Sequence, residues 1–178
     1  ASDGCNSLAE LIIAFKEETI AGNCAGNYQI KRSWTTTDQC GNSSTATQTI
    51  TVIDDIAPVL LNVPQNITVS CDAIPAASNT VSTTDNCEAN AGISIVFEER
   101  VTAGSCAGNY TITRSWIATD ACGNKNIAEQ IITVVDNSAP VLINIPADET
   151  VACDAIPAVS TTVSATDNCE ASEAINIA

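Results

Sequence analysis

Cysteine is the residue type in this chain with the clearest capacity for chemistry, and all nine cysteines fall on one fixed period of 82. The four series are Cys5, Cys87 and Cys169; Cys24 and Cys106; Cys40 and Cys122; and Cys71 and Cys153. Four thiols per period fit either two disulfides or a zinc site of four thiolates. The spacings are 19, 16, 31 and 16, with no Cys-x-x-Cys pair, so they favour disulfides. With no histidine or methionine present, this pattern predicts an oxidising, extracellular compartment.

The same period governs the whole chain. A shift by one period compares 96 positions, of which 54 are identical, and such a period is typical of tandem structural repeats. The segment Asp54–Pro58 recurs at Asp136–Pro140, and its proline predicts a short extended linker. We therefore expect a complete repeat at 58–139, the C-terminal part of another at 1–57, and the N-terminal part of a third at 140–178.

Alternating apolar residues separated by turn sequences predict the elements of the repeat. The strands are expected at about 66–71, 79–85, 93–101, 109–119 and 126–135, with a short extra strand at 59–62. Thr, Ser, Val and Ile are abundant in the chain, which suits strands. The predicted fold class is all-β, with tandem immunoglobulin-like β-sandwich repeats and two disulfides per repeat.

Two charged residues interrupt the alternation. Glu99 shares its parity with Phe97 and Val101, and Arg114 shares its parity with Ile112 and Trp116. A charge on a buried face needs a partner, so we expect Glu99 to pair with Arg114 near the Trp116 ring. The preceding copy repeats the pair as Glu17 and Arg32. The alternative is that these residues lie at solvated strand ends.

Strand direction predicts which cysteines meet. If consecutive strands alternate in direction, Cys71 and Cys106 lie at one end of the repeat, and Cys87 and Cys122 lie at the other. The local pairs would have to span a strand of about 25–30 Å, whereas a disulfide needs Cα atoms within about 7 Å. The predicted bridges are therefore Cys71–Cys106, Cys87–Cys122 and, by translation, Cys5–Cys40. The partners of Cys24, Cys153 and Cys169 are expected outside this stretch of chain.

The net charge of −15 disfavours nucleic acid and anionic membranes as partners and makes cations the natural counterpart. No histidine and no Gly-rich phosphate loop is present, so we do not expect an enzyme. The acidic turns and linkers predict a candidate Ca²⁺ site at the repeat junctions, since Ca²⁺ prefers six to eight oxygen ligands. Its residues are Asp54, Asp55, Asp85, Asn86, Asp120, Asp136, Asn137 and Asp167. The alternative is that each aspartate caps its own turn.

The motifs resemble a known domain family. Ser-Trp-Ile-Ala-Thr-Asp-Ala-Cys-Gly-Asn at 115–124, Ile-Thr-Val-Val-Asp at 132–136 and Ala-Pro-Val at 139–141 resemble hyalin-type (HYR) repeats. Together with Ser-Cys-Asp at 70–72 and Thr-Asp-Asn-Cys at 84–87, they look like the four-cysteine HYR-like form. The resemblance implies an immunoglobulin-like fold in very large surface proteins of Bacteroidota, including gliding-motility adhesins exported by the type IX secretion system.

These observations favour a structural and adhesive module of an extracellular fibre or cell-surface stalk, stiffened by disulfides and by interdomain calcium. The expected partners are neighbouring repeats of the same chain, other fibre chains or surface glycans. The alternative is a secreted module that binds a glycan or a protein through its loops. The near identity of the loops between copies argues against a dedicated binding site in either copy.

Overall fold

The computed structural model describes residues 12–87, 92–106 and 108–177. Their regular structure consists of β-strands and short 3₁₀ turns, without an α-helix among the described residues, so the predicted all-β class is confirmed. The strands of the first copy are β1 (Ile12–Ala21), β2 (Tyr28–Thr37) and β3 (Ser43–Val52), and β4 (Val59–Leu61) is the first strand after the 54–58 segment. They are followed by β5 (Ile67–Ser70), β6 (Ser82–Thr84), β7 (Ser94–Ala103), β8 (Tyr110–Thr119), β9 (Lys125–Val135), β10 (Val141–Ile143), β11 (Ser164–Thr166) and the 3₁₀ turn η3 (Ser172–Ala174).

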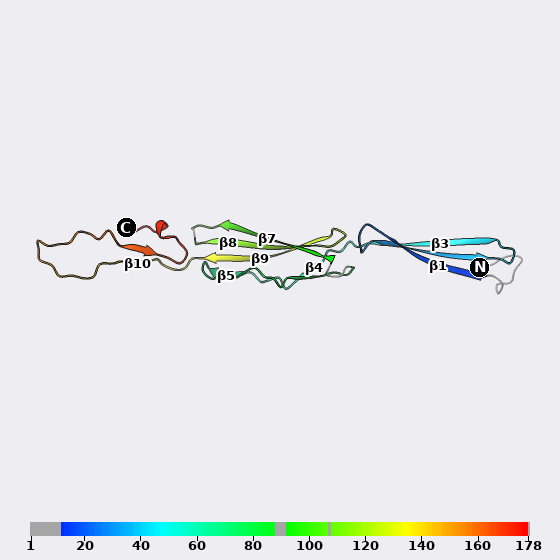
Figure 1. Ribbon diagram of the computed structural model, residues 1–178, viewed down its shortest axis with the longest axis horizontal. Helices are drawn as coiled ribbons and strands as arrows, with labels where there is room; N and C mark the ends of the chain where they lie inside the picture. The colour runs from blue at the N-terminus through cyan, green and yellow to red at the C-terminus, as the bar shows by residue number, and fades with distance from the viewer. Residues whose placement is uncertain (1–11, 88–91, 107, 178) are drawn as a thin grey trace. The chain divides into compact units, whose positions relative to one another are not determined.

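The strands form four sheets. Strands β1, β2 and β3 make an antiparallel sheet in that order, and β5, β9, β8 and β7 make a four-stranded sheet (Figure 1). Two short antiparallel pairs, β4–β6 and β10–β11, complete the set. Strand β5 pairs in parallel with β9, with Ile67 opposite Ile132, so these two strands run in the same direction. Every strand predicted for the complete repeat is present, although the 79–85 segment is a strand only at β6.

The core of the complete repeat lies on one face of β8 and β9. Side chains alternate in burial along β8, where Ile112, Trp116 and Ala118 are buried. Ile112 packs in one cluster with Ile132 and Val134 of β9. The edge strand β7 is exposed along its length, although Phe97 places its ring 5.4 Å from that of Trp116. An edge strand has a neighbour on one side only, which leaves its apolar side chains less covered.

The buried charge on β8 has the partner that the sequence predicts. Arg114 is 4 % exposed, and its Nε donates to Glu99 Oε2 at 2.8 Å. The two terminal nitrogens donate to the carbonyl oxygens of Pro75 and Ala76 at 2.9 and 3.2 Å. Among the described residues, Trp116 makes its ring contact with Phe97 rather than with the guanidinium. Arg114 therefore ties the 75–76 segment to the β8 strand.

The first copy contains the same ion pair in a more open setting. Arg32 Nε lies 2.8 Å from Glu17 Oε2, but the two side chains are 37 % and 43 % exposed. The identical geometry in both copies means that the pairing is encoded within the β-hairpin itself. In the complete repeat, the carbonyl oxygens of Pro75 and Ala76 also accept from Arg114, which accounts for its deeper burial.

The chain divides into two compact units, one formed by 1–61, 81–96 and 117–127 and the other by 62–80, 97–116 and 128–178. The first unit contains the linker 54–58 and the second contains the linker 136–140. Each unit therefore brings together residues from both sides of a predicted repeat boundary. The boundaries at 58 and 139 remain predictions of the sequence period.

The difference in burial between the two arginines predicts different effects on stability. Arg114→Ala removes three hydrogen bonds from a buried site, so we expect the free energy of unfolding to fall by about 3–5 kcal/mol. Arg32→Ala, the matched control in the first copy, should cost about 0–1 kcal/mol because its ion pair is half exposed. Urea unfolding of the disulfide-bonded chain, followed by tryptophan fluorescence, measures both. Equal effects from the two variants would contradict this account of the buried site.

Candidate functional site

Two disulfides join residues that belong to different predicted repeats. Cys24 is bonded to Cys122 with Cα atoms 5.1 Å apart, and Cys71 is bonded to Cys169 with Cα atoms 5.7 Å apart. Both bridges span 98 residues, which is longer than the sequence period. Each bridge therefore links a cysteine of one predicted repeat to a cysteine of the next predicted repeat, across the 54–58 or 136–140 segment.

The predicted pairing is thus wrong. Cys71–Cys106 and Cys87–Cys122 do not form, because Cys71 and Cys122 have partners in neighbouring repeats and Cys87 and Cys106 carry free thiols. Cys40 is also unbridged, and its predicted partner Cys5 lies outside the described residues. The expectation that Cys24 and Cys169 pair outside the chain is wrong as well.

The predicted pairing is wrong because the loops at each end of a repeat also contact the loops of the adjacent repeat. The predicted grouping of cysteines by end agrees with the compact units, since Cys71 and Cys106 share one unit and Cys87 and Cys122 share the other. The strand-direction argument, however, compared only cysteines of the same repeat. The loops at each end also face those of the adjacent repeat, and there the Cα atoms approach to disulfide distance.

The loop that carries Cys122 is fixed by its own aspartate. Asp120 accepts hydrogen bonds from the backbone N–H and the side-chain amide of Asn124, both at 2.8 Å. Gly123 completes the turn at φ +90°, a conformation that favours glycine. Burial opposes ionisation of Asp120, but these hydrogen bonds outweigh it and hold the pKa of the carboxyl below its usual value. The loop is therefore pre-shaped to present Cys122.

The linker is held between this loop and the loop of Cys24. Asn27, which follows Cys24 closely in the chain, accepts the backbone N–H of Asp54 at 2.6 Å through its side-chain oxygen. Asn124 donates to the Asp54 carbonyl oxygen at 3.2 Å. Two asparagines, one from each predicted repeat, thus hydrogen-bond to the backbone N–H and to the carbonyl oxygen of Asp54. The Cys24–Cys122 bridge lies beside a linker that both of its loops bind.

The second junction repeats one half of this arrangement. Asn109 accepts the backbone N–H of Asp136 at 2.7 Å, and Asp167 accepts the backbone N–H of Cys169 at 2.7 Å. A Cβ atom on Gly108 would lie 2.6 Å from Asp136 Cβ and 2.9 Å from Cys169 Cβ. Only glycine allows so close an approach of the loop to the linker and the bridge.

The sequence analysis missed the glycines and asparagines of these junctions. In the first copy, a Cβ atom on Gly26 would lie 2.5 Å from Asp54 Cβ, as at Gly108. The available signal was the identical Cys-Ala-Gly-Asn-Tyr at 24–28 and 106–110. Identity over a whole loop indicates that the loop meets a constant surface, which here is the linker.

The predicted calcium ligands act largely as turn caps. Asp85, Asp120 and Asp167 accept backbone N–H groups of their own turns. The linker residues Asp54 and Asp136 accept those of Ile56 and Ser138. Of the remaining candidates, Asp55, Asn86 and Asn137 are exposed. The alternative of local caps therefore describes most of the set.

Two observations favour a cation at the junctions. Asp54 is 7 % exposed, and its Oδ2 is buried without a hydrogen-bond partner. In the other unit, single ligand atoms of Asp136, Asp167 and Cys169 lie within 4.8 Å of one another. Cys169 is in a disulfide, so its sulfur is not a thiolate ligand. The fit to Ca²⁺ is therefore partial, because the grouped protein oxygens are fewer than the six to eight that Ca²⁺ takes.

The thiol of Cys87 does not have the character of a nucleophile. Desolvation raises its pKa, and the negative charges of four nearby carboxylates add to the effect. These carboxylates belong to Asp54, Asp85, Asp55 and Asp120. A reactive cysteine needs a lowered pKa, so this thiol suits a structural role.

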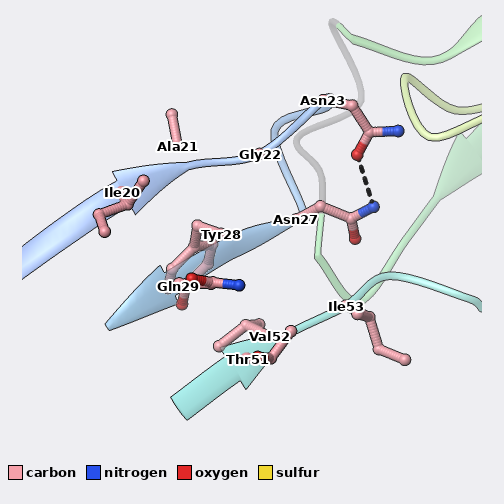
Figure 2. Close-up of a pocket in the computed structure, with 10 residues that line it drawn as sticks. All are labelled: Ile20, Ala21, Gly22, Asn23, Asn27, Tyr28, Gln29, Thr51, Val52 and Ile53. Atoms are coloured by element: carbon pink, nitrogen blue, oxygen red, sulfur yellow. Dashed lines mark hydrogen bonds between the residues drawn. The ribbon is translucent and has the colours of Figure 1, made fainter. Parts of the chain in front are cut away.

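A pocket of about 360 Å³ lies at one end of the β1–β2–β3 sheet (Figure 2). Its walls include Tyr28 and Thr51–Ile53, and an amide hydrogen bond of 3.0 Å joins Asn27 to Asn23. In the complete repeat, the positions that correspond to Thr51–Ile53 are paired with strand β5. The pocket thus marks the place that a strand of the same fold occupies, rather than a shaped ligand site.

The two bridges predict a specific peptide map. Trypsin cleavage should link peptide 17–31 to 115–125 through Cys24–Cys122, and 33–100 to 126–178 through Cys71–Cys169. Mass spectrometry under non-reducing conditions identifies the linked pairs. Recovery of 33–100 linked to 101–114, the product expected from Cys71–Cys106, would contradict the structure.

The close packing of the glycines predicts local damage. Gly108→Ala should lower the yield of Cys71–Cys169 several-fold, because the added methyl group overlaps Asp136 and Cys169. The other bridge, Cys24–Cys122, should form normally and serves as an internal control. Gly26→Ala should show the reverse pattern, since its methyl group overlaps Asp54. Equal loss of both bridges in either variant would indicate general misfolding instead.

Among the described residues, no helix is long and apolar enough to cross a membrane.

No protein-family model and no curated protein matches the chain. Solved structures do match. Protocadherin gammaB7 repeats EC3–6 have 15% identity over 78% of this chain and 45% of that chain, with a TM-score of 0.32. Drosophila N-cadherin EC1–4 has 14% identity over 74% and 43%, also with a TM-score of 0.32. The protocadherin gammaB4 extracellular domain has 17% identity over 78% and 30%, again with a TM-score of 0.32. The chain spans less than half the length of these structures.

Proposed function

We propose that this chain is a segment of an extracellular stalk or fibre whose repeats are joined covalently and carry tension. The observation behind this proposal is that both disulfides cross a predicted repeat boundary. A disulfide within a domain stabilises that domain alone. A disulfide between successive repeats also limits how far the repeats can separate, which is useful in a protein that transmits force.

The bridges shorten the path that force takes through the chain. When the chain is pulled from its ends, the Cys24–Cys122 bond bypasses the 98-residue stretch between them. The Cys71–Cys169 bond bypasses a stretch of equal length that overlaps the first. Either bond alone leaves only about 80 residues free to extend, so the two bonds back each other up.

The location and partners follow from the same chemistry. Disulfides persist outside the reducing cytosol, which supports a secreted or surface position. The resemblance to HYR-like repeats supports a Bacteroidota surface protein, with adhesion and gliding motility as the setting. Neighbouring repeats of the same chain are the first partners, and other fibre chains or surface glycans are further ones. A dedicated ligand-binding module has less support, because the pocket of the first copy is a strand position in the second.

Calcium is the secondary part of this proposal. The buried, unpartnered Oδ2 of Asp54 is the observation in its favour. Asp54 and the acidic turns around Cys87 would hold the ion, which would neutralise carboxylates that otherwise repel. The ion would strengthen a junction that the disulfide already closes.

Single-molecule stretching of this chain tests the proposal. The oxidised chain should reach a maximum extension of about 260–290 Å, and the reduced chain about 590–640 Å. Cys24→Ser alone should behave like the oxidised wild type, because Cys71–Cys169 still shortens the path. The double variant Cys24→Ser/Cys71→Ser should reach the full length without reductant.

The contrary outcome is an oxidised wild-type chain that extends as far as the reduced one, which would remove the force-bearing role. Repeating the measurement with Ca²⁺ and with a chelator separates the secondary proposal. Ca²⁺ should raise the force at which the native chain first opens and leave the maximum extension unchanged. An unchanged opening force would exclude calcium and leave the disulfide proposal intact.

A further inference from the structure

We infer that the four free cysteines among the described residues form the same two kinds of bridge with neighbouring repeats. Every junction between repeats would then be closed by two disulfides. The free thiols are Cys40, Cys87, Cys106 and Cys153, and all four are exposed. The inference rests on the proposed function, because it requires further repeats of the same period on both sides. It assigns each free thiol a partner of known type and distance along the chain.

The pairing rule comes from the bridges that are present. Cys24–Cys122 joins the second cysteine series to the third of the next repeat, and Cys71–Cys169 joins the fourth series to the first of the next repeat. Applied at the same offset along the chain, the rule pairs Cys106 and Cys153 with cysteines of a following repeat. It pairs Cys40 and Cys87 with cysteines of a preceding repeat.

Each free cysteine sits in a loop with the geometry of its bridged counterpart. In the loop of Cys106, the Asn109 N–H donates to the Cys106 carbonyl oxygen at 3.0 Å, as Asn27 does to Cys24 at 3.1 Å. Asn42 caps Asp38 beside Cys40 with two bonds of 2.8 Å, as Asn124 caps Asp120 beside Cys122.

The other series shows the same agreement. The Cys87 N–H donates to Asp85 Oδ1 at 2.8 Å, and the Cys169 N–H donates to Asp167 Oδ1 at 2.7 Å. The turns after Cys71 and Cys153 each close with a backbone hydrogen bond of 3.0 Å, donated by Ala73 and Ala155. The loops are therefore shaped for bridging before a partner is bound.

The completed pattern gives two continuous covalent paths along the array. On the first path, a bridge enters the repeat at Cys122, the chain runs back through β8 to Cys106, and the next bridge leaves. On the second path, the entry is Cys87 and the exit is Cys71, so an equal length of chain lies between them. A repeat would then stretch to about 50–60 Å at most, compared with about 270–300 Å for the whole chain of one period.

The bond formation is a two-electron oxidation. Two thiols lose two protons and two electrons and form one S–S bond, while a disulfide oxidant takes up both and becomes two thiols. In the test this oxidant is oxidised glutathione, which yields two molecules of reduced glutathione per bridge.

The experiment uses this chain extended by one period. A second copy of residues 97–178 is added after Ala178, which continues the period without a break. In the copy, Val101→Ile and Lys125→Arg, both at exposed positions, mark the tryptic peptides by mass and keep the cleavage sites. The oxidised chain is digested and mapped without reduction.

Two new bridges are expected, from Cys106 to the copied Cys122 and from Cys153 to the copied Cys169. Cys40 and Cys87 should still react with a thiol reagent, because their partners would precede the chain. Cys106→Ser should abolish the first new bridge and leave the second, which shows that the two form independently.

The inference is overturned if Cys106 and Cys153 stay free, or if Cys106 pairs with Cys71 or with the Cys122 of its own repeat. If both thiols stay free, Cys24–Cys122 and Cys71–Cys169 still form. If Cys106 bonds Cys71 or Cys122 instead, one of these two bridges is lost, and the other still shortens the path in the stretching experiment on the shorter chain. Failure of this inference is therefore distinct from failure of the proposed stalk function.

Discussion

The structure depends on the distance that a disulfide imposes. The Cα atoms of Cys24 and Cys122 must lie within about 6 Å, and so must those of Cys71 and Cys169. Because each bond joins two repeats, the loops and the linker around it have to pack closely as well. The glycines at 26 and 108 permit this approach, and the asparagines that follow them bind the linker backbone. A bulkier loop could not bring the sulfur atoms together.

The same bonds matter for the stability of a small β-sandwich. Its core is built on the aliphatic side chains of Ile112, Ile132 and Val134, and the guanidinium of Arg114 ties the 75–76 segment to β8. A loop of 98 residues closed by a disulfide contributes about 4–5 kcal/mol in the chain-entropy view. That is a large part of the roughly 5–15 kcal/mol typical of a domain. Folding and linkage between repeats are therefore served by the same two bonds.

The acidic residues serve mainly to fix the turns that carry the cysteines. A turn that must present a cysteine at a fixed place benefits from a carboxylate that accepts its backbone N–H groups, as Asp120 and Asp167 do. Repeating such turns in every copy makes the chain strongly acidic. Desolvation, and after it the carboxylates near Cys87, raise the pKa of the Cys87 thiol and disfavour the reactive thiolate.

The sequence by itself determined the repeat period, the all-β class, the strand positions and the ion pair of Glu99 with Arg114. These features depend on local alternation of side chains and on contacts between adjacent strands, so a single repeat contains the information. It also grouped the cysteines by the end of the repeat at which they lie. Only the tertiary structure decided that Cys71 bonds Cys169 rather than Cys106, and that Gly108 and Asn109 are junction residues. The physical reason is that a bond between repeats depends on which loops meet across a linker, and the alternation within one repeat carries no record of that contact.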